Sequence, residues 1–255
     1  SIRERPWRAG PRRVPVKTQL SCSRVLFTVL AVVSLGLTHP VICGATDVTW
    51  YDADGHPLPF ASPDEIERFL ETAEIVSDRP LHTGRSGPRK LVLEQDGVRV
   101  AAAFNASDDV VRGITRHYDV NVSDFRDSYL FNCAAYRLDR LLGLNRVPPT
   151  VAREVGRTSG SVSLWIENTI TEKDRRDRGL EAPNQFRWNQ QKKIMVVFDN
   201  LIGNVDRNQG NILIDRSWRL WLIDHTRAFI TTNELTTPRS LTRCERGLYT
   251  ALQQL

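Results

Sequence analysis

The sequence has few residues of the kinds that build structural metal sites or disulfide frameworks. It contains four cysteines and five scattered histidines in 255 residues, and no two cysteines form a Cys-x-x-Cys pair. Cys133 falls in an apolar helical pattern and is expected to be a buried thiol. A Cys133–Cys244 disulfide in an oxidising compartment stays open, because spacing alone does not decide pairing. A structural zinc site is not expected.

A basic surface is also lacking outside the first residues of the chain. The net charge is +5, but residues 1–24 hold seven Lys and Arg against one Glu, which gives +6 and leaves −1 for the rest. The basic character therefore belongs to one terminal segment, and no nucleic-acid partner is expected. An apolar fraction of 40% and this length are sufficient for one large domain or two lobes with a core.

An apolar run follows Arg24 and is interrupted at His39 and Pro40. A basic start, an apolar middle and a small residue at Ala45 are typical of a secretory signal peptide, and the run is marginal for a spanning helix. Residues 1–45 are therefore expected to be a signal peptide or an anchor, which exports or tethers the protein. The alternative is an upstream translation artefact, since the chain starts at Ser1 without Met, and the protein would then be cytoplasmic.

Local patterns predict most of the remaining elements. Residues 46–79 are expected to form an N-terminal extension whose helix is capped by Ser62 and opened by Pro63. Asp96-Gly97 predicts a tight turn between two strands. The other expected elements are a long helix over 123–142, strands at 146–155 and 159–167, a short charged helix after 171, a helix over 188–200, strands ILI and LWLI near 212–223, and one helix over 239–255.

Two further features are of the kinds that bind phosphates or the metal ions that accompany them. Gly84, Ser86 and Gly87 lie in a flexible loop beside the predicted hairpin, where they could cover nucleotide phosphates or form a simple connection. Asp206, Asn211 and Asp224 lie at the ends of a helix and of short strands. Asp206 is placed to accept a hydroxyl proton, and the other two side chains offer oxygen ligands for Mg²⁺. The alternative is that this segment is only a polar turn.

Arg207 lies beside Asp206 and could neutralise phosphate charge. The segment DRNQGNILI followed by WLIDHTRAF resembles the catalytic and metal-binding segments of the phosphatidylinositol 3-/4-kinase-like superfamily. It is also similar to the Fam20/HipA-like atypical kinases, and most similar to a group of bacterial, largely uncharacterised proteins of this kind. The resemblance extends from about Phe60 to the end of the chain.

The resemblance implies an α+β, bilobal protein-kinase-like fold, with a small β-rich N-lobe over residues 80–166 and a helical C-lobe over 167–255. It implies ATP and Mg²⁺ as cofactors, and a hydroxyl acceptor on a protein, a lipid or a small molecule. Asp206 would be the catalytic base, Asn211 and Asp224 the magnesium ligands, and Glu167 part of the hinge beside adenine. Large lobes of this kind usually contain more helices, so a truncated C-lobe is expected.

Two positions depart from the pattern of these kinases. Asn105 stands where a basic residue at the end of the second hairpin strand would grip the nucleotide phosphates, and Asn132 stands where its glutamate partner would lie. An amide–amide contact could replace the ion pair, or Lys90, Arg99 or Arg112 could supply the charge instead. Three functions remain open: an ATP-dependent phosphotransferase, a pseudokinase that binds nucleotide or acts as a scaffold, and a secreted domain that binds no nucleotide.

Overall fold

The computed structural model describes residues 48–81, 87–117, 120–232 and 234–255. These residues belong to one structural unit, Val41–Leu255. The predicted signal peptide or anchor, with Cys22 and Cys43, lies outside the described residues. Within the described ranges, no helix is long and apolar enough to cross a bilayer.

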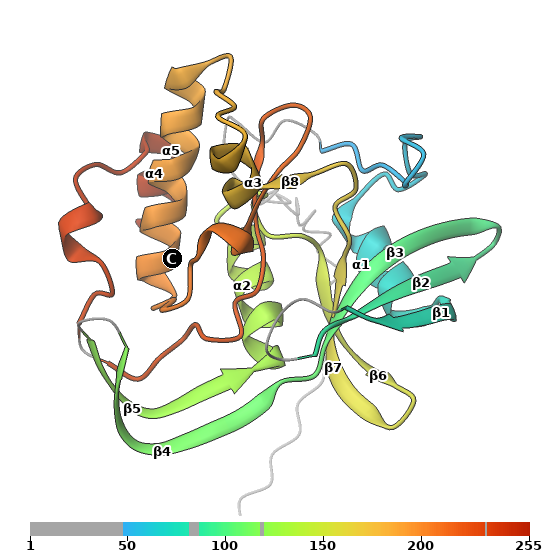
Figure 1. Cartoon of the computed structure of the whole chain (residues 1–255), viewed down its shortest axis with the longest axis horizontal. Helices are drawn as coiled ribbons and strands as arrows, with labels where there is room; N and C mark the ends of the chain where they lie inside the picture. The colour runs from blue at the N-terminus through green and yellow to red at the C-terminus, as the bar shows by residue number, and fades with distance from the viewer. Residues whose placement is uncertain (1–47, 82–86, 118–119, 233) are drawn as a thin grey trace, which may run out of the picture. The chain divides into compact units, whose positions relative to one another are not determined.

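The larger sheet has 5 antiparallel strands in the order β1-β2-β3-β7-β6 (Figure 1). Asp96 and Gly97 join β2 to β3 with φ angles of 52° and 76°, the left-handed values that a two-residue hairpin turn requires. The hairpin that these two residues predicted is therefore confirmed. The bounds of the strands are β1 (Glu74–Pro80), β2 (Arg89–Gln95), β3 (Val98–Asn105), β6 (Thr150–Val155) and β7 (Thr158–Leu164).

The helix α1 (Pro63–Thr72) packs against β6 and β7. The Ser62 hydroxyl accepts a hydrogen bond from the Glu65 N–H at 3.3 Å, and Pro63 stands in the first turn, so the predicted start of this helix is confirmed. Its apolar side closes the N-lobe core. Trp221, from the other lobe, also reaches this core, where its ring lies 5.2 Å from that of Trp50.

The helix α2 (Tyr129–Leu141) is shorter than predicted. Residues 123–128, expected to be helical, belong instead to β5 (Val120–Ser128), which pairs with β4 (Asp108–His117) in a separate hairpin (Figure 1). Phe125 and Tyr129 are four residues apart, which is the spacing of apolar residues on one face of a helix. Phe125 in fact packs with Val120, Val122 and Val205 in a small cluster of its own. The backbone of β5 is satisfied by β4, a long-range pairing that a local pattern does not record.

The C-lobe is built around a second core, which includes Tyr136, Trp188 and Phe198. Its small sheet has the order β10-β9-β8, and the strands predicted at ILI and LWLI are confirmed as β9 and β10. The bounds in this lobe are β8 (Ile170–Thr171), α3 (Glu172–Asp177), α4 (Gln185–Leu201), η1 (Gln209–Asn211), β9 (Ile212–Ile214), β10 (Leu220–Leu222), η2 (Pro238–Ser240) and α5 (Arg246–Leu252).

The single helix expected over residues 239–255 is wrong. Only the short α5 forms, after the 3-10 turn η2 and an irregular stretch. The Glu245 carboxylate accepts the Leu248 N–H at 2.9 Å, so it caps a helix that begins at Arg246 rather than continuing one from Arg239. The buried side chains of this helix, Leu248 and Ala251, join the C-lobe core.

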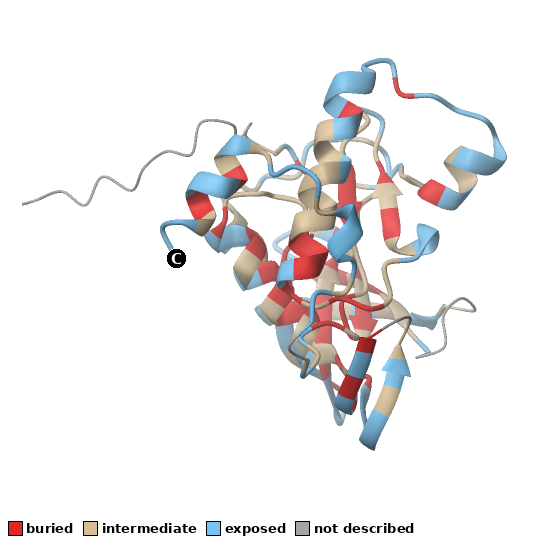
Figure 2. Cartoon of the chain, turned by 90° about the vertical axis from the view of Figure 1, so that its left-hand side faces the viewer, coloured by how far each residue is buried: buried red, intermediate tan, exposed pale blue. Residues whose placement is uncertain are grey.

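The two cores give the chain the predicted α+β, bilobal layout. Figure 2 shows the buried residues gathered where helices and strands meet, with exposed residues on the outer turns. Cys133 is buried and Cys244 is exposed, and both are free thiols, so the disulfide that the sequence left open is not formed.

Candidate active site

A cavity of about 1010 Å³ lies between the strands of the two sheets. Phe104 on β3 and Leu164 on β7 line it from the N-lobe, and Leu213 on β9 and Leu222 on β10 line it from the C-lobe. Polar side chains also face this space from both lobes. The three residues predicted as base and metal ligands are among them: Asp206, Asn211 and Asp224.

Hydrogen bonds connect Asn211 to Asp206, and to Ile223, the residue before Asp224. The Asn211 side-chain amide donates from Nδ2 to the Asp206 carbonyl at 3.0 Å, which leaves the amide oxygen as the atom available to a cation. The Asn211 carbonyl in turn accepts the N–H of Ile223 at 3.2 Å, next to Asp224. The loop and the end of β10 are thus held together by main-chain and side-chain bonds within a few residues of the cavity.

Arg207 supports this arrangement from behind. Its guanidinium binds both carboxylate oxygens of Asp199 and donates to the carbonyls of Asn211, at 2.8 Å, and Ile223, at 2.7 Å. The Arg207 side chain is 9% exposed and does not line the cavity. The expectation that Arg207 neutralises phosphate charge is therefore wrong. Its donors are already used by the loop that carries Asp206 and by the strand that ends at Asp224.

Replacing Arg207 by Lys should destabilise the fold. Lysine keeps the charge but cannot reproduce the planar fork that reaches Asp199 and two carbonyls together. We expect the free energy of unfolding in urea to fall by about 1–3 kcal/mol. Arg216→Lys is the matched control, because Arg216 is exposed and donates to the Asn168 side chain. An equal change in both variants would contradict the bracing role.

Asp224 occupies an unfavourable position for a carboxylate. Its φ of 54° is in the left-handed region, which is uncommon for residues other than glycine and is often found at functional sites. Burial raises the pKa of its carboxyl above the ordinary 3.8, and the charges of Asp206 and Asp127 raise it further. The Thr226 hydroxyl, which donates to Asp224 at 3.1 Å, and the Arg207 charge act in the opposite direction.

The donor set fits a hard divalent cation. Carboxylate and amide oxygens are the ligands that Mg²⁺ takes in proteins, and Asp224 and Asn211 offer one of each. The raised pKa of Asp224 also supports this assignment, since a cation would relieve the repulsion that its neighbours exert on the ionised form.

Asn105 and Asn132 both line the cavity, at the positions where the sequence placed the lost ion pair. Ser161 on β7 connects them, because its hydroxyl accepts from Asn132 Nδ2 at 3.0 Å and donates to the Asn105 carbonyl at 3.4 Å. Asn132 Oδ1 also accepts the backbone N–H of His225 at 2.7 Å. One neutral amide therefore joins the N-lobe sheet to the turn that carries Asp224.

The cations proposed as substitutes do not reach this cavity. The Lys90 ammonium lies 4.1 Å from the centre of the Trp165 ring and 3.5 Å from the Glu167 carboxylate. Arg99 pairs with Glu94 on the hairpin surface. Arg112 is exposed on β4. These alternatives are wrong, because each side chain is held elsewhere or points to solvent.

Asp127 and Arg227, which the sequence did not single out, also face the cavity. Arg227 donates from Nε to Asp127 at 2.7 Å and from Nη1 to Asp206 at 3.3 Å. Asp127 lies in the stretch that was predicted to be helical. Arg227 is 21 residues from Asp206 in the chain, so its contact with the base depends on the fold. Only the proximity of Arg227 to Asp224 in the sequence could have drawn attention to it.

Three solved structures are similar in fold to this chain. The chain is similar to a hydra Fam20 solved with a sugar, with a TM-score of 0.56 and 15% identity over 76% of each chain. It is also similar to the Golgi casein kinase in two structures, one of them with Mn/ADP bound, each with a TM-score of 0.53 and 15% identity. The chain has a Fam20-like kinase fold. These matches cover 76% of this chain and 64% and 65% of the Golgi casein kinase.

Sequence comparison does not assign the chain to a family. No family model matches the chain, and no curated protein matches it. At 15% identity the likeness concerns the fold, so the roles of individual residues depend on the geometry described above.

The predicted nucleotide end of the Fam20-like fold is described only in part. Gly84 and Ser86 lie outside the described residues, and Gly87 has a φ of 59°. Pro88, next to Gly87, lines the cavity, as does Ile166, next to Glu167. Glu167 itself does not line the cavity but faces Lys90. Gly87 does not line the cavity either, so the contacts of Gly87 and Glu167 with nucleotide stay a prediction.

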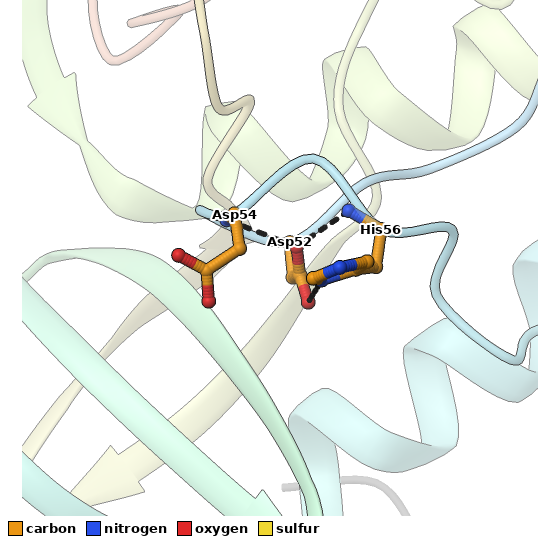
Figure 3. Close-up of side chains that lie close together, drawn as sticks. All are labelled: Asp52, Asp54 and His56. Atoms are coloured by element: carbon orange, nitrogen blue, oxygen red, sulfur yellow. Dashed lines mark hydrogen bonds and ion pairs between the residues drawn. The ribbon is translucent and has the colours of Figure 1, made fainter.

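A second group of potential metal ligands lies far from this site in the chain, at Asp52, Asp54 and His56 (Figure 3). Asp52 Oδ1 accepts the N–H groups of Asp54, at 3.0 Å, and His56, at 2.8 Å. These bonds show that the three residues form a surface turn, which the Asp52 side chain stabilises.

Proposed function

We propose that this chain is a phosphotransferase that uses ATP and Mg²⁺ or Mn²⁺ to phosphorylate a hydroxyl group. The observation that carries the proposal is that Asp206, Asn211 and Asp224 face one cavity in a Fam20-like fold. Hydrogen bonds also connect Asn211 to Asp206 and to Ile223, the residue before Asp224. Asp206 would orient the acceptor hydroxyl and take its proton. A cation held by Asn211 and Asp224 would supply charge neutralisation for the phosphates.

The surrounding residues position these groups and limit their movement. The Asp206 N–H donates to Asn204 Oδ1 at 2.9 Å, and Asn204 Nδ2 donates to Asp199 at 3.0 Å, so the base stands on a loop with internal bonds. His225 is buried, and its burial lowers its pKa well below 6.5, so it adds no charge beside the site. Because rigid placement is most of what phosphoryl transfer requires of a protein, this loop suits the reaction.

The acceptor is proposed only as a hydroxyl compound. The hydra Fam20 was solved with a sugar and the other neighbour is a casein kinase, so sugar and protein hydroxyls are both acceptor classes to test.

A pseudokinase is the second candidate function. The neutral pair Asn105 and Asn132 favours it, since the usual cation and its glutamate partner are both replaced. Such a protein would bind nucleotide with the same metal ligands but would transfer no phosphoryl group.

Metal-dependent nucleotide binding tests both candidates. With Mg²⁺, ADP at 100 times its Kd should stabilise the full chain by about 2.7 kcal/mol. For a domain of this size the melting temperature should then rise by about 5–10 °C. EDTA should remove this shift, and adding Mg²⁺ or Mn²⁺ back should restore it. An unchanged melting temperature at millimolar ADP with either metal would rule out nucleotide binding, and with it both candidates.

A further inference from the structure

The cavity is unusually acidic for a site that would hold a nucleotide. Its charged lining residues within the described ranges are Asp109, Asp127, Asp174, Asp206, Asp224 and Arg227. With His225 neutral, five carboxylates and one guanidinium give a formal charge of −4. A polyphosphate is repelled by such a lining unless cations offset it. Arg227 is the one permanent cation that the described lining provides.

Arg227 makes one short hydrogen bond and one long one, and the long one can be exchanged for a bond to a ligand. Its Nε donates to Asp127 Oδ2 at 2.7 Å, a normal charge-assisted distance. Its Nη1 lies 3.3 Å from Asp206 Oδ2, which is long for such a bond. The side chain is 30% exposed, so part of it is open to a ligand. A planar guanidinium with several donors is well suited to phosphate oxygens.

The backbone around Arg227 fixes its position between the base and the metal ligands. The Arg227 carbonyl accepts the Val205 N–H at 3.4 Å, directly before Asp206. The preceding Thr226 carbonyl accepts the Ser128 N–H at 2.8 Å, directly after Asp127. Arg227 is therefore attached on one side to the loop of the base and on the other to the end of β5. Asp224 lies three residues earlier in the same turn.

We propose that Arg227 binds the nucleotide phosphates in this chain, in place of the strand-end cation that Asn105 does not provide. Without nucleotide, its second donor pairs with Asp206 and offsets the charge of the base. With nucleotide, that donor turns to a phosphate oxygen while Asp127 keeps the guanidinium in place, and Asp206 is released to accept a proton. The inference rests on the proposed function, because it requires that the cavity binds a nucleotide.

Comparing ADP with adenosine separates phosphate binding from general support of the fold. We expect Arg227→Gln in the full chain to weaken ADP binding, measured calorimetrically with Mn²⁺, by about 10–100-fold, the value of one or two charge-assisted bonds. Adenosine binding should change by less than about threefold, because adenosine has no phosphate. Arg227→Lys should lie between. Arg126→Gln is the matched control, since Arg126 pairs with the exposed Asp108 and does not line the cavity.

A rescue variant covers the case in which Arg227→Gln merely disturbs the site. Asn105→Lys introduces a cation at another point of the same cavity, and in the Arg227→Gln background it should recover at least about tenfold of ADP affinity. A purely structural Arg227 would lose adenosine and ADP binding together and would not be rescued, which overturns the proposal. If Arg227→Gln does not fold, unchanged ADP affinity in Arg227→Lys overturns it. Wild-type protein that binds adenosine but not ADP also overturns it, whereas binding of neither ligand overturns the proposed function as well.

Discussion

Asp206→Asn is expected to lower phosphoryl transfer by about 10²–10⁴-fold, the usual contribution of a positioned general base. Asparagine keeps the shape of the side chain and the acceptor at Oδ1, but it cannot take a proton. The reaction is measured as phosphate release from ATP with water as acceptor, and as labelling of the protein itself by [γ-³²P]ATP. Neither readout requires the natural acceptor to be known.

The nucleotide affinity of Asp206→Asn should not fall with its activity. Asp206 is proposed to act on the acceptor, and its loss frees Arg227 from one of its two carboxylate partners. ADP binding should therefore stay the same or become tighter. Asp177→Asn is the control, because that carboxylate lies on the surface with Lys173. Full activity in Asp206→Asn would show that Asp206 is not the base. A wild-type protein that binds ADP tightly but transfers no phosphoryl group would favour the pseudokinase.

Asp224→Asn should separate stability from ligand binding. Without metal, the variant should be more stable than the wild type, by about 1 kcal/mol or 2–4 °C in melting temperature, because a buried charge beside other carboxylates is removed. The loss of the charged ligand should at the same time weaken Mg²⁺-dependent ADP binding by more than about 100-fold. Asp96→Asn controls for the backbone, since Asp96 has a similar φ of 52° but lies in an exposed turn.

The stability gain of Asp224→Asn should depend on pH in a defined direction. The pKa of Asp224 is raised in the folded state above the 3.8 of the unfolded chain, so the folded wild type binds the proton more tightly. Ionising Asp224 therefore costs stability as pH rises from about 4 to its folded pKa, and the cost is constant above it. The gain should be smallest near pH 4 and should grow as pH rises through the folded pKa. A variant less stable than the wild type at pH 7 without metal would show that the carboxylate is stabilising there.

The elements that the sequence predicted correctly are those whose signals lie within a few residues. Ser62 and Pro63 start α1 through contacts inside one turn, and Asp96-Gly97 supplies both left-handed residues of its hairpin. The cavity residues Asp206, Asn211 and Asp224 were also found from their spacing, because two short strands fix the distance between the loop and the end of β10. The helical start at residue 123 failed for the opposite reason, since the pairing of β5 with β4 outweighs a local stripe.

By itself, the sequence determined the β2–β3 hairpin, the strands β9 and β10, and the three polar residues that face the cavity. Only the tertiary structure decided what the charges do. Arg207, adjacent to Asp206, is buried against Asp199, while Arg227 reaches Asp206 from 21 residues away. Asn132 meets Ser161 and His225, which are 29 and 93 residues distant. Hydrogen bonds of this range depend on how strands and helices pack, and a side chain's neighbours in the chain do not reveal its partners in space.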